Sequence, residues 1–156
     1  VWPWNERLRP LVEAAAERQK PRLTDRDPLI RMEAISEAWS RGLTPLLADA
    51  LPLLDDRDAR VRRRARKMLP VLIGPPTATV TLQVAETLQP VTRRMVTLWA
   101  LRRGGLATLE TAEAIMAGSH PTVSPRPSAE VLRDLQVAAR RVLVRERPIA
   151  KLLGLR

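Results

Sequence analysis

A segment of about thirty residues recurs along this chain, and the recurrence restricts the folds that the chain can adopt. Residues 23–34 read LTDRDPLIRMEA and residues 54–65 read LDDRDARVRRRA, with Leu, Asp-Arg-Asp, a β-branched residue, Arg and Ala at a constant offset of 31 positions. A weaker third copy, which keeps Arg93 but lacks both aspartates, follows after the same offset. Because a period of roughly 30 residues is typical of stacked helical hairpins, the sequence predicts an all-α chain, an α-solenoid of about three hairpins with an additional helix at each end.

The composition favours helices over strands. The 156 residues are 45% hydrophobic, mostly Leu, Val, Ala and Ile, and they include four Trp but no Phe or Tyr. Strands are usually enriched in aromatic side chains, so this composition agrees with an all-helical fold. We predict helices over residues 5–18, 27–40, 44–54, 57–72, 77–88, 90–102, 106–117 and 128–147.

Each of the first two copies carries a signal for the start of a helix. Asp27 is a favourable N-cap residue, Pro28 suits the first helical position, and Asp58 caps the second copy. Behind each cap, aliphatic and small residues recur four positions apart, which predicts one buried face per helix. Trp39 and Trp99 fall late in their helices, where we expect them to pack in the core or between repeats.

We assign the chain to one domain, since 156 residues is an ordinary length for a single domain. The chain begins at Val1 rather than at Met, which leaves open that it is a fragment of a larger protein anchored upstream. The expected order is an N-terminal segment with a helix (1–22), three repeats within 23–117 (23–53, 54–84 and 85–117), a loop rich in Pro and Ser (118–128), and a basic C-terminal helix with its tail (129–156).

The motif D-R-D-x-x-[IV]-R-x-x-A of the first two copies resembles HEAT repeats in their short form, well over residues 23–73 and less closely to residue 117. The resemblance implies a right-handed stack of hairpins, with the first helices on the convex face and the second helices on the concave face. It also implies that the Asp and Arg of the motif link adjacent repeats, with Arg93 reaching back to Asp58. The residues of this structural ladder are then Asp27, Arg31, Asp58, Arg62 and Arg93.

The expected second helices carry almost no charge. Between Val71 and Thr92 the one charged residue is Glu86. An exposed groove of this apolar kind is typical of a site for a protein or an amphipathic helix. We therefore interpret the chain as a non-catalytic scaffold that binds a protein partner. The expected partner site consists of Leu46, Leu47, Leu51, Leu82 and Glu86.

An alternative is that the C-terminal helix folds back and covers this surface. The apolar side chains available for such a covering face are Val131, Leu135, Val137, Ala138, Val142 and Leu143. The tail PIAKLLGLR could likewise dock on the repeats, bind a partner or touch an anionic membrane.

The net charge of +10 comes from two short segments. Residues 56–67 and residues 133–156 each carry seven basic and two acidic side chains, and the rest of the chain sums to zero. Such helices are either a solvated outer face or a surface for phosphates, which Arg binds through its forked guanidinium. The alternative function is therefore a nucleic-acid-binding HEAT-like module whose affinity falls steeply with salt. Its candidate phosphate ligands are Arg60, Arg63, Arg64, Lys67, Arg94, Arg102, Arg103, Arg140 and Arg141.

The sequence shows no catalytic motif. The chain has no Cys and one His, His120, which excludes disulfides, thiol nucleophiles, Cys zinc sites and sites built on a pair of His. Its paired carboxylates stand at helix starts, where capping explains them. We therefore expect no enzymatic activity, no cofactor, no metal and no small-molecule substrate. No apolar run reaches the ~18 residues of a membrane span, so we expect no membrane partner for this stretch, and the compartment stays open with a slight preference for the cytoplasm.

Overall fold

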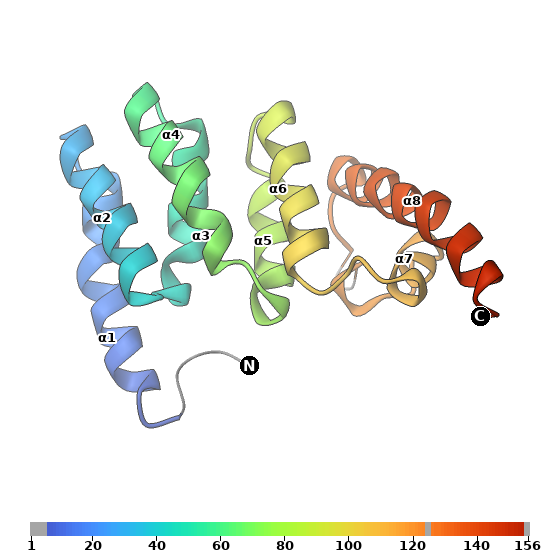
Figure 1. The fold of residues 1–156 in the computed structure, drawn as a ribbon. Coiled ribbons are helices and arrows are strands. Elements are labelled where there is room, and N and C mark those ends of the chain that lie inside the picture. Colours follow the sequence, from blue (N-terminus) through green and yellow to red (C-terminus); the bar gives the residue numbers. More distant parts are fainter. Residues whose placement is uncertain (1–5, 124–125, 155–156) are drawn as a thin grey trace. The chain divides into compact units, whose positions relative to one another are not determined.

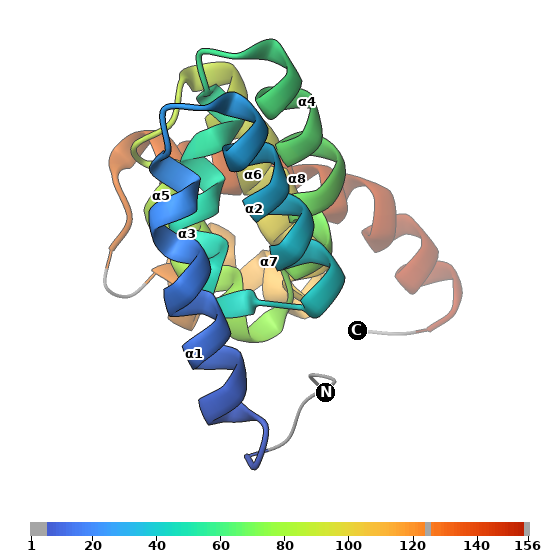
Figure 2. The ribbon, with the colours of Figure 1, turned by 90° about the vertical axis from the view of Figure 1, so that its left-hand side faces the viewer.

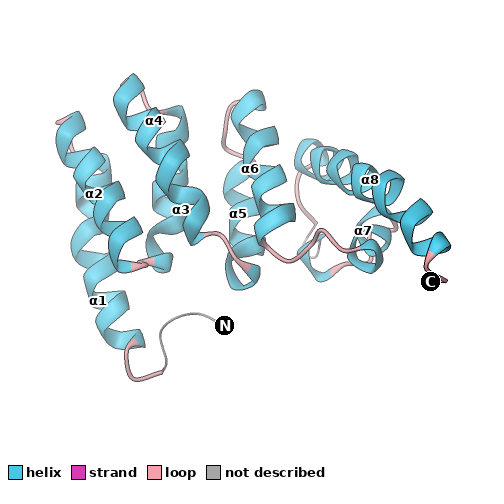
Figure 3. Ribbon diagram, in the orientation of Figure 1, coloured by secondary structure: helices cyan, strands magenta, loops and turns pink. Residues whose placement is uncertain are grey.

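The computed structural model describes residues 6–123 and 126–154, and the regular structure within these ranges is helical throughout, with no strand (Figure 3). Eight α-helices and six short 3-10 helices follow one another along the described residues, which confirms the all-α prediction. The chain divides into two compact units, Val1–Ile73 and Gly74–Arg156, which we call the N-terminal and C-terminal units.

In the N-terminal unit, the helices of the first and second repeat copies, α2 and α4, lie side by side (Figures 1 and 2). The predicted start of the first helix at Asn5 lies outside the described residues. The elements of this unit, with 3-10 helices marked η, are α1 (Arg9–Gln19), η1 (Lys20–Thr24), α2 (Pro28–Arg41), η2 (Thr44–Leu46), α3 (Leu47–Ala50), η3 (Leu51–Asp55), α4 (Ala59–Met68) and η4 (Leu69–Leu72).

Prolines interrupt the helices that the sequence predicts as continuous. The predicted helix 44–54 consists of the short α3 between two 3-10 segments, and the predicted helix 57–72 changes to 3-10 geometry after Met68. Pro52 and Pro70 stand at the start of these 3-10 segments. Because Pro has no backbone N–H, it cannot continue the α-helical hydrogen-bond ladder.

The 31-residue repeat reappears as a repeated set of hydrogen bonds. Asp25 Oδ1 accepts from the amide of Asp27 at 2.8 Å, and Asp56 Oδ1 accepts from the amide of Asp58 at the same distance. Asp27 and Asp58 each then accept from the amide two residues further on, at 2.9 and 2.8 Å. Both residues are therefore the N-caps that the sequence predicts, and two linked Asp turns set the start of α2 and of α4.

The predicted ladder is reduced to one link between these two copies, from Arg31, and its carboxylate is not the predicted one. The ladder roles predicted for Asp27 and Arg62 are wrong, because Asp27 caps α2 and Arg62 bonds within its own copy. Arg31 is 4% exposed and donates to both carboxylate oxygens of Asp56, at 2.9 and 3.0 Å, and to the backbone carbonyl of Asp25 at 2.7 Å. Asp58, which belongs to the predicted ladder, instead accepts a hydrogen bond from the backbone as the N-cap of α4. Arg62 repeats the backbone contact and donates to the carbonyl of Asp56 at 2.6 Å.

In the C-terminal unit, α5 packs on α6, and α8 packs on both α6 and α7 (Figure 1). At Gly104 a side chain has no room, because a Cβ atom there would lie 2.8 Å from the Cβ of Ala78. The glycine therefore permits the close approach of α5 to the end of α6. The elements are η5 (Pro75–Thr77), α5 (Ala78–Ala85), α6 (Pro90–Arg103), α7 (Leu109–Met116), η6 (Pro121–Val123) and α8 (Ala129–Leu152).

Arg93 has a different partner from the predicted one. Its Nε donates to Asp134 Oδ2 at 2.8 Å, so that it joins α6 to α8 inside the C-terminal unit and replaces the expected link to Asp58. Asp134 lies in the last helix, outside the repeat motif, and the period of 31 residues therefore could not identify it.

The last helix is longer than predicted and buries one face. It continues to Leu152 instead of ending near Arg147, and it contains Pro148. Its buried residues are Val131, Leu135, Ala138, Ala139 and Leu143. Val137, which the sequence places on the covering face, is exposed, and so is Trp39 in α2, at 46% against the expectation of a packed side chain.

Candidate binding surfaces

The predicted protein-binding leucines are core residues. Leu46, Leu47, Leu51 and Leu82 are each at most 1% exposed. Glu86 is exposed, but its Oε1 accepts a hydrogen bond from the amide of Ser128 at 2.6 Å and so holds the start of α8. The predicted neutral site is therefore wrong in its residues, because these leucines are already covered and have no surface to offer.

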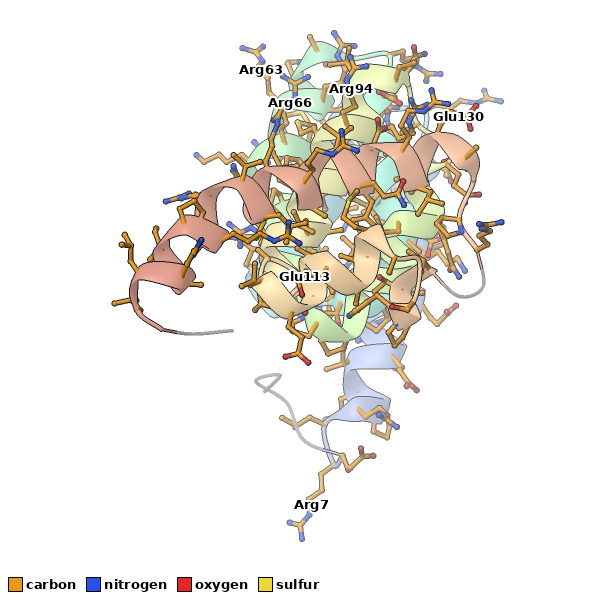
Figure 4. All side chains as sticks on the ribbon, turned by 90° about the vertical axis from the view of Figure 1, so that its right-hand side faces the viewer. Arg7, Arg63, Arg66, Arg94, Glu113 and Glu130 are labelled. Atoms are coloured by element: carbon orange, nitrogen blue, oxygen red, sulfur yellow. The ribbon has the colours of Figure 1, made fainter. Side chains whose placement is uncertain are left out.

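Three cations on α4 extend into solvent without a partner. Arg63, Arg66 and Lys67 are exposed, and no described residue accepts a hydrogen bond or ion pair from their side chains. Arg63 and Arg66 both point outward from α4 (Figure 4). We call these three residues the α4 basic face. Arg66 was not among the predicted phosphate ligands, although its spacing of three residues from Arg63 places it on the same side of the helix.

The other predicted cations of α4 are occupied inside the N-terminal unit. Arg60 donates to both carboxylate oxygens of Asp58, at 3.2 and 2.9 Å. This side-chain hydrogen bond lowers the pKa of Asp58 well below its ordinary value and raises the pKa of the Arg60 guanidinium. Arg64 reaches back to α2 and donates to the Ser36 hydroxyl at 2.8 Å. Arg60 and Arg64 are therefore less available to a ligand than the α4 basic face.

A second surface with cations lies on the outward side of α8. Val137, Arg140, Arg141, Val144 and Arg145 line a shallow hollow of about 370 Å³ there, and we call these five residues the α8 face. Val144 is 71% exposed. The two valines are seven residues apart, which places them on one stripe of the helix, with the arginines on either side of it.

The α8 face continues into a hollow on each side. Towards α6, a hollow of about 380 Å³ is lined by Arg94, Met95 and Leu98 together with residues of α8. Towards α7, a hollow of about 520 Å³ is lined by Met116 and by Leu143, Val144 and other residues of α8. The surface around Val144 is therefore hollowed, largely aliphatic, and bordered by guanidinium groups.

The C-terminal end of α8 extends past α7 (Figures 1 and 4). Ile149, Leu152 and Leu153 are exposed there, Leu152 by 87%. Arg147 forms an exposed ion pair with Glu113 of α7 at 3.2 Å near this end of α8. The segment predicted as a separate tail is thus part of α8 up to Leu152.

The remaining predicted phosphate ligands do not form one group. Arg94 borders the α6 hollow, and Arg140 and Arg141 belong to the α8 face. Arg102 and Arg103 are exposed at the end of α6. The sequence therefore identified the basic helices. It did not show which cations border exposed aliphatic side chains and which do not.

The described residues offer no metal site. They contain no group of three His, Cys, Asp or Glu side chains that could hold a metal ion. His120 Nδ1 lies 2.8 Å from the Thr122 hydroxyl in its own loop. Among the same residues, no single helix is both long and apolar enough to cross a membrane, and 59–72 with 75–85 passes only as a bent pair taken together.

Comparison with known proteins gives no relative for this chain. No protein-family model matches it, and no curated protein or solved structure matches it.

Proposed function

We propose that this chain is a non-catalytic helical-repeat module of HEAT type that binds a protein partner through the α8 face. The observation that carries the proposal is the combination around Val144: exposed aliphatic side chains, a hollow on each side, and arginines along the border. Exposed aliphatic surface of this kind is stabilised when a partner covers it.

The chemistry of the α8 face favours an amphipathic helix with acidic flanks. An amphipathic helix places apolar side chains at positions i, i+3, i+4 and i+7, which fits a stripe of aliphatic residues with hollows beside it. Carboxylates along the edges of that helix would pair with Arg140, Arg141 and Arg145. Charge pairs at the border mainly accelerate association and select the partner, while the covered valines supply affinity.

The HEAT assignment rests on the repeated contacts of the N-terminal unit. The Asp turns, the caps and the Arg contacts to a backbone carbonyl recur in α2 and α4 at the offset of 31 residues. In the C-terminal unit, helices that follow one another along the chain also pack together as the pairs α5–α6 and α7–α8. A stack of such hairpins is the architecture that the motif implies.

The proposal is tested with a defined peptide. A labelled amphipathic helix of about 18 residues, five helical turns with a Leu ridge between Glu flanks, is titrated with the whole chain by fluorescence anisotropy. We expect Val144→Asp to weaken binding by at least about tenfold, or ~1.4 kcal/mol. Val91→Asp is the matched control, because Val91 is 69% exposed and lies on α6 outside the hollows.

Two results would refute this assignment. Equal binding by the Val144→Asp and Val91→Asp proteins would place the site elsewhere. A scrambled peptide with the same composition but no ridge would, if it bound as tightly, show that charge alone attracts the peptide. The same ridge flanked by Lys tests the sign, and we expect it to bind more weakly.

A further inference from the structure

Two carboxylates at the start of α4, Asp56 and Asp58, have partners other than the α4 basic face. Asp56 is held by Arg31, and Asp58 caps the helix and pairs with Arg60. The helix itself, from Ala59 to Met68, contains no acidic residue. The negative charge of this region is therefore consumed internally, and the outward side of α4 remains positive.

The α4 basic face is electrostatically unfavourable for the isolated chain. Arg63 lies three residues from Arg66 and four from Lys67, so the three side chains are neighbours of like charge on one side of a helix. Some exposed cations elsewhere are offset by acids, as Arg41 is by Glu37 on α2 and Arg147 is by Glu113 beside α8, whereas the three cations of the α4 basic face stand together on one helix side. An uncompensated cluster of this kind becomes favourable when an anion lies on it.

The α4 basic face differs from a protein-binding or membrane-binding surface by what it lacks. None of the exposed large hydrophobic residues of the described chain lies in α4, and the nearest along the sequence is Val71 in η4. Helices that insert into a membrane surface add aliphatic or aromatic anchors to their cations, and protein interfaces bury an apolar centre. Cations alone suit a ligand that presents charge without apolar groups.

We propose that the α4 basic face holds the phosphate backbone of a nucleic-acid duplex. Side chains three and four residues apart on a helix have Cβ atoms roughly 5–6 Å apart. Along one strand of a duplex the phosphates follow at ~3.4 Å of axis, so about two phosphates lie within that span and further ones lie within reach of the long side chains. Two guanidinium groups and one ammonium can pair with such a run of phosphates, and contact with phosphates alone reads no base sequence. The α4 basic face shares no residue with the α8 face.

The test is a titration of a fluorescein-labelled DNA duplex of random sequence with the whole chain at several salt concentrations. We expect the logarithm of the binding constant to fall linearly with the logarithm of salt. Replacing Arg63→Gln, Arg66→Gln and Lys67→Gln together should make that slope shallower by about 2–3, since each lost phosphate contact removes about 0.9. Binding at low salt should fall by at least about tenfold in the same variant.

The matched control removes the same charge elsewhere. It carries Arg102→Gln, Arg103→Gln and Arg133→Gln, at residues that are exposed and have no partner among the described residues. Like the α4 substitutions, these three lower the net charge of +10 by three. We expect this control to keep the slope of the unaltered chain. Circular dichroism checks that both variants fold, and Arg66→Gln alone, with an expected slope change of about 0.9, serves if the triple variant is less stable.

The following results would overturn the proposal. They are no binding at low salt, equal losses in the two triple variants, and competition by polyglutamate as strong as that by unlabelled duplex. Binding to phosphatidylserine vesicles that the α4 substitutions abolish, without an effect on duplex binding, would assign the face to a lipid surface instead.

Discussion

The outward sides of α4 and α8 have similar charge but different surroundings. Each helix belongs to a segment with seven basic and two acidic residues. On α4 itself no large aliphatic side chain is exposed, whereas on α8 Val137 and Val144 are exposed between arginines and border hollows. Net charge alone therefore does not define a ligand. The apolar atoms next to the cations distinguish a surface for phosphates from a surface for an amphipathic helix.

The largest expected effect concerns the contact that keeps acidic charge away from the α4 basic face. We expect Arg31→Ala to lower the free energy of unfolding by about 3–5 kcal/mol, because it leaves the Asp56 carboxylate buried without its cation. Urea unfolding followed by circular dichroism measures this loss. Arg62→Ala removes one bond to a carbonyl and should cost about 1 kcal/mol. If the two substitutions cost the same, the ion pair with Asp56 does not hold the repeats together.

The second effect is a crossed loss of binding. We expect Val144→Asp to weaken binding of the acidic peptide by about tenfold, ~1.4 kcal/mol, and to leave duplex binding nearly unchanged. The triple substitution on α4 should do the reverse. Anisotropy titrations of both ligands against both variants measure the four affinities. Loss of both ligands in either variant would mean that the two surfaces act as one site, and the distinction between α4 and α8 would fail.

The smallest effect is a difference in acid sensitivity between the two caps. The pKa of Asp58 is lowered by the Arg60 side-chain hydrogen bond, so its contribution to stability is fully present above the ordinary Asp pKa of about 3.9. That contribution is lost as pH falls below this value towards the lowered pKa of the folded state. Asp58→Asn keeps a capping oxygen but removes the titration, and should therefore flatten the acid limb of a stability profile.

The first repeat supplies the control for this measurement. Asp27 caps α2 by the same backbone bond, but position 29 is Leu, so no guanidinium stands where Arg60 stands. Urea unfolding at pH 6, 4 and 3 for Asp58→Asn and Asp27→Asn compares the two caps. Identical profiles for both variants would contradict the role of Arg60.

Local chemistry made part of this fold predictable. Asp27 and Asp58 are confirmed as caps because an N-cap depends on residues only two positions away. Helix ends near Pro52 and Pro70 were harder, since the sequence signals a break without telling whether a 3-10 segment continues beyond it. Asp56 and Asp58 stand two residues apart, and the position of α2 in space decides which of them meets Arg31.

The binding surfaces depend on contacts that a linear pattern does not contain. A charge-free stretch such as that around Leu82 reads the same whether it is core or an open groove, and the structure makes it core. The exposure of Val144 follows from which side of α8 meets α6 and α7. Whether a cation of α4 is free to bind a ligand depends on contacts that are distant in the sequence. Arg63 has no partner within the described part of the chain, whereas its neighbour Arg64 donates to Ser36, 28 residues away.

Pro148 gives α8 a mechanical property that its length conceals. Because proline has no N–H, the carbonyl of Val144 lacks its donor four residues on, and the helix is weakest at this point. No side chain described after Leu143 is buried, so bending here breaks no core contact. The packed part of α8 before Pro148 is thus stiff, and the end after it can bend. Amide hydrogen exchange should change from slow to fast at this proline. The end of α8 after Pro148 can therefore bend around a bound partner while the part before Pro148 keeps its shape.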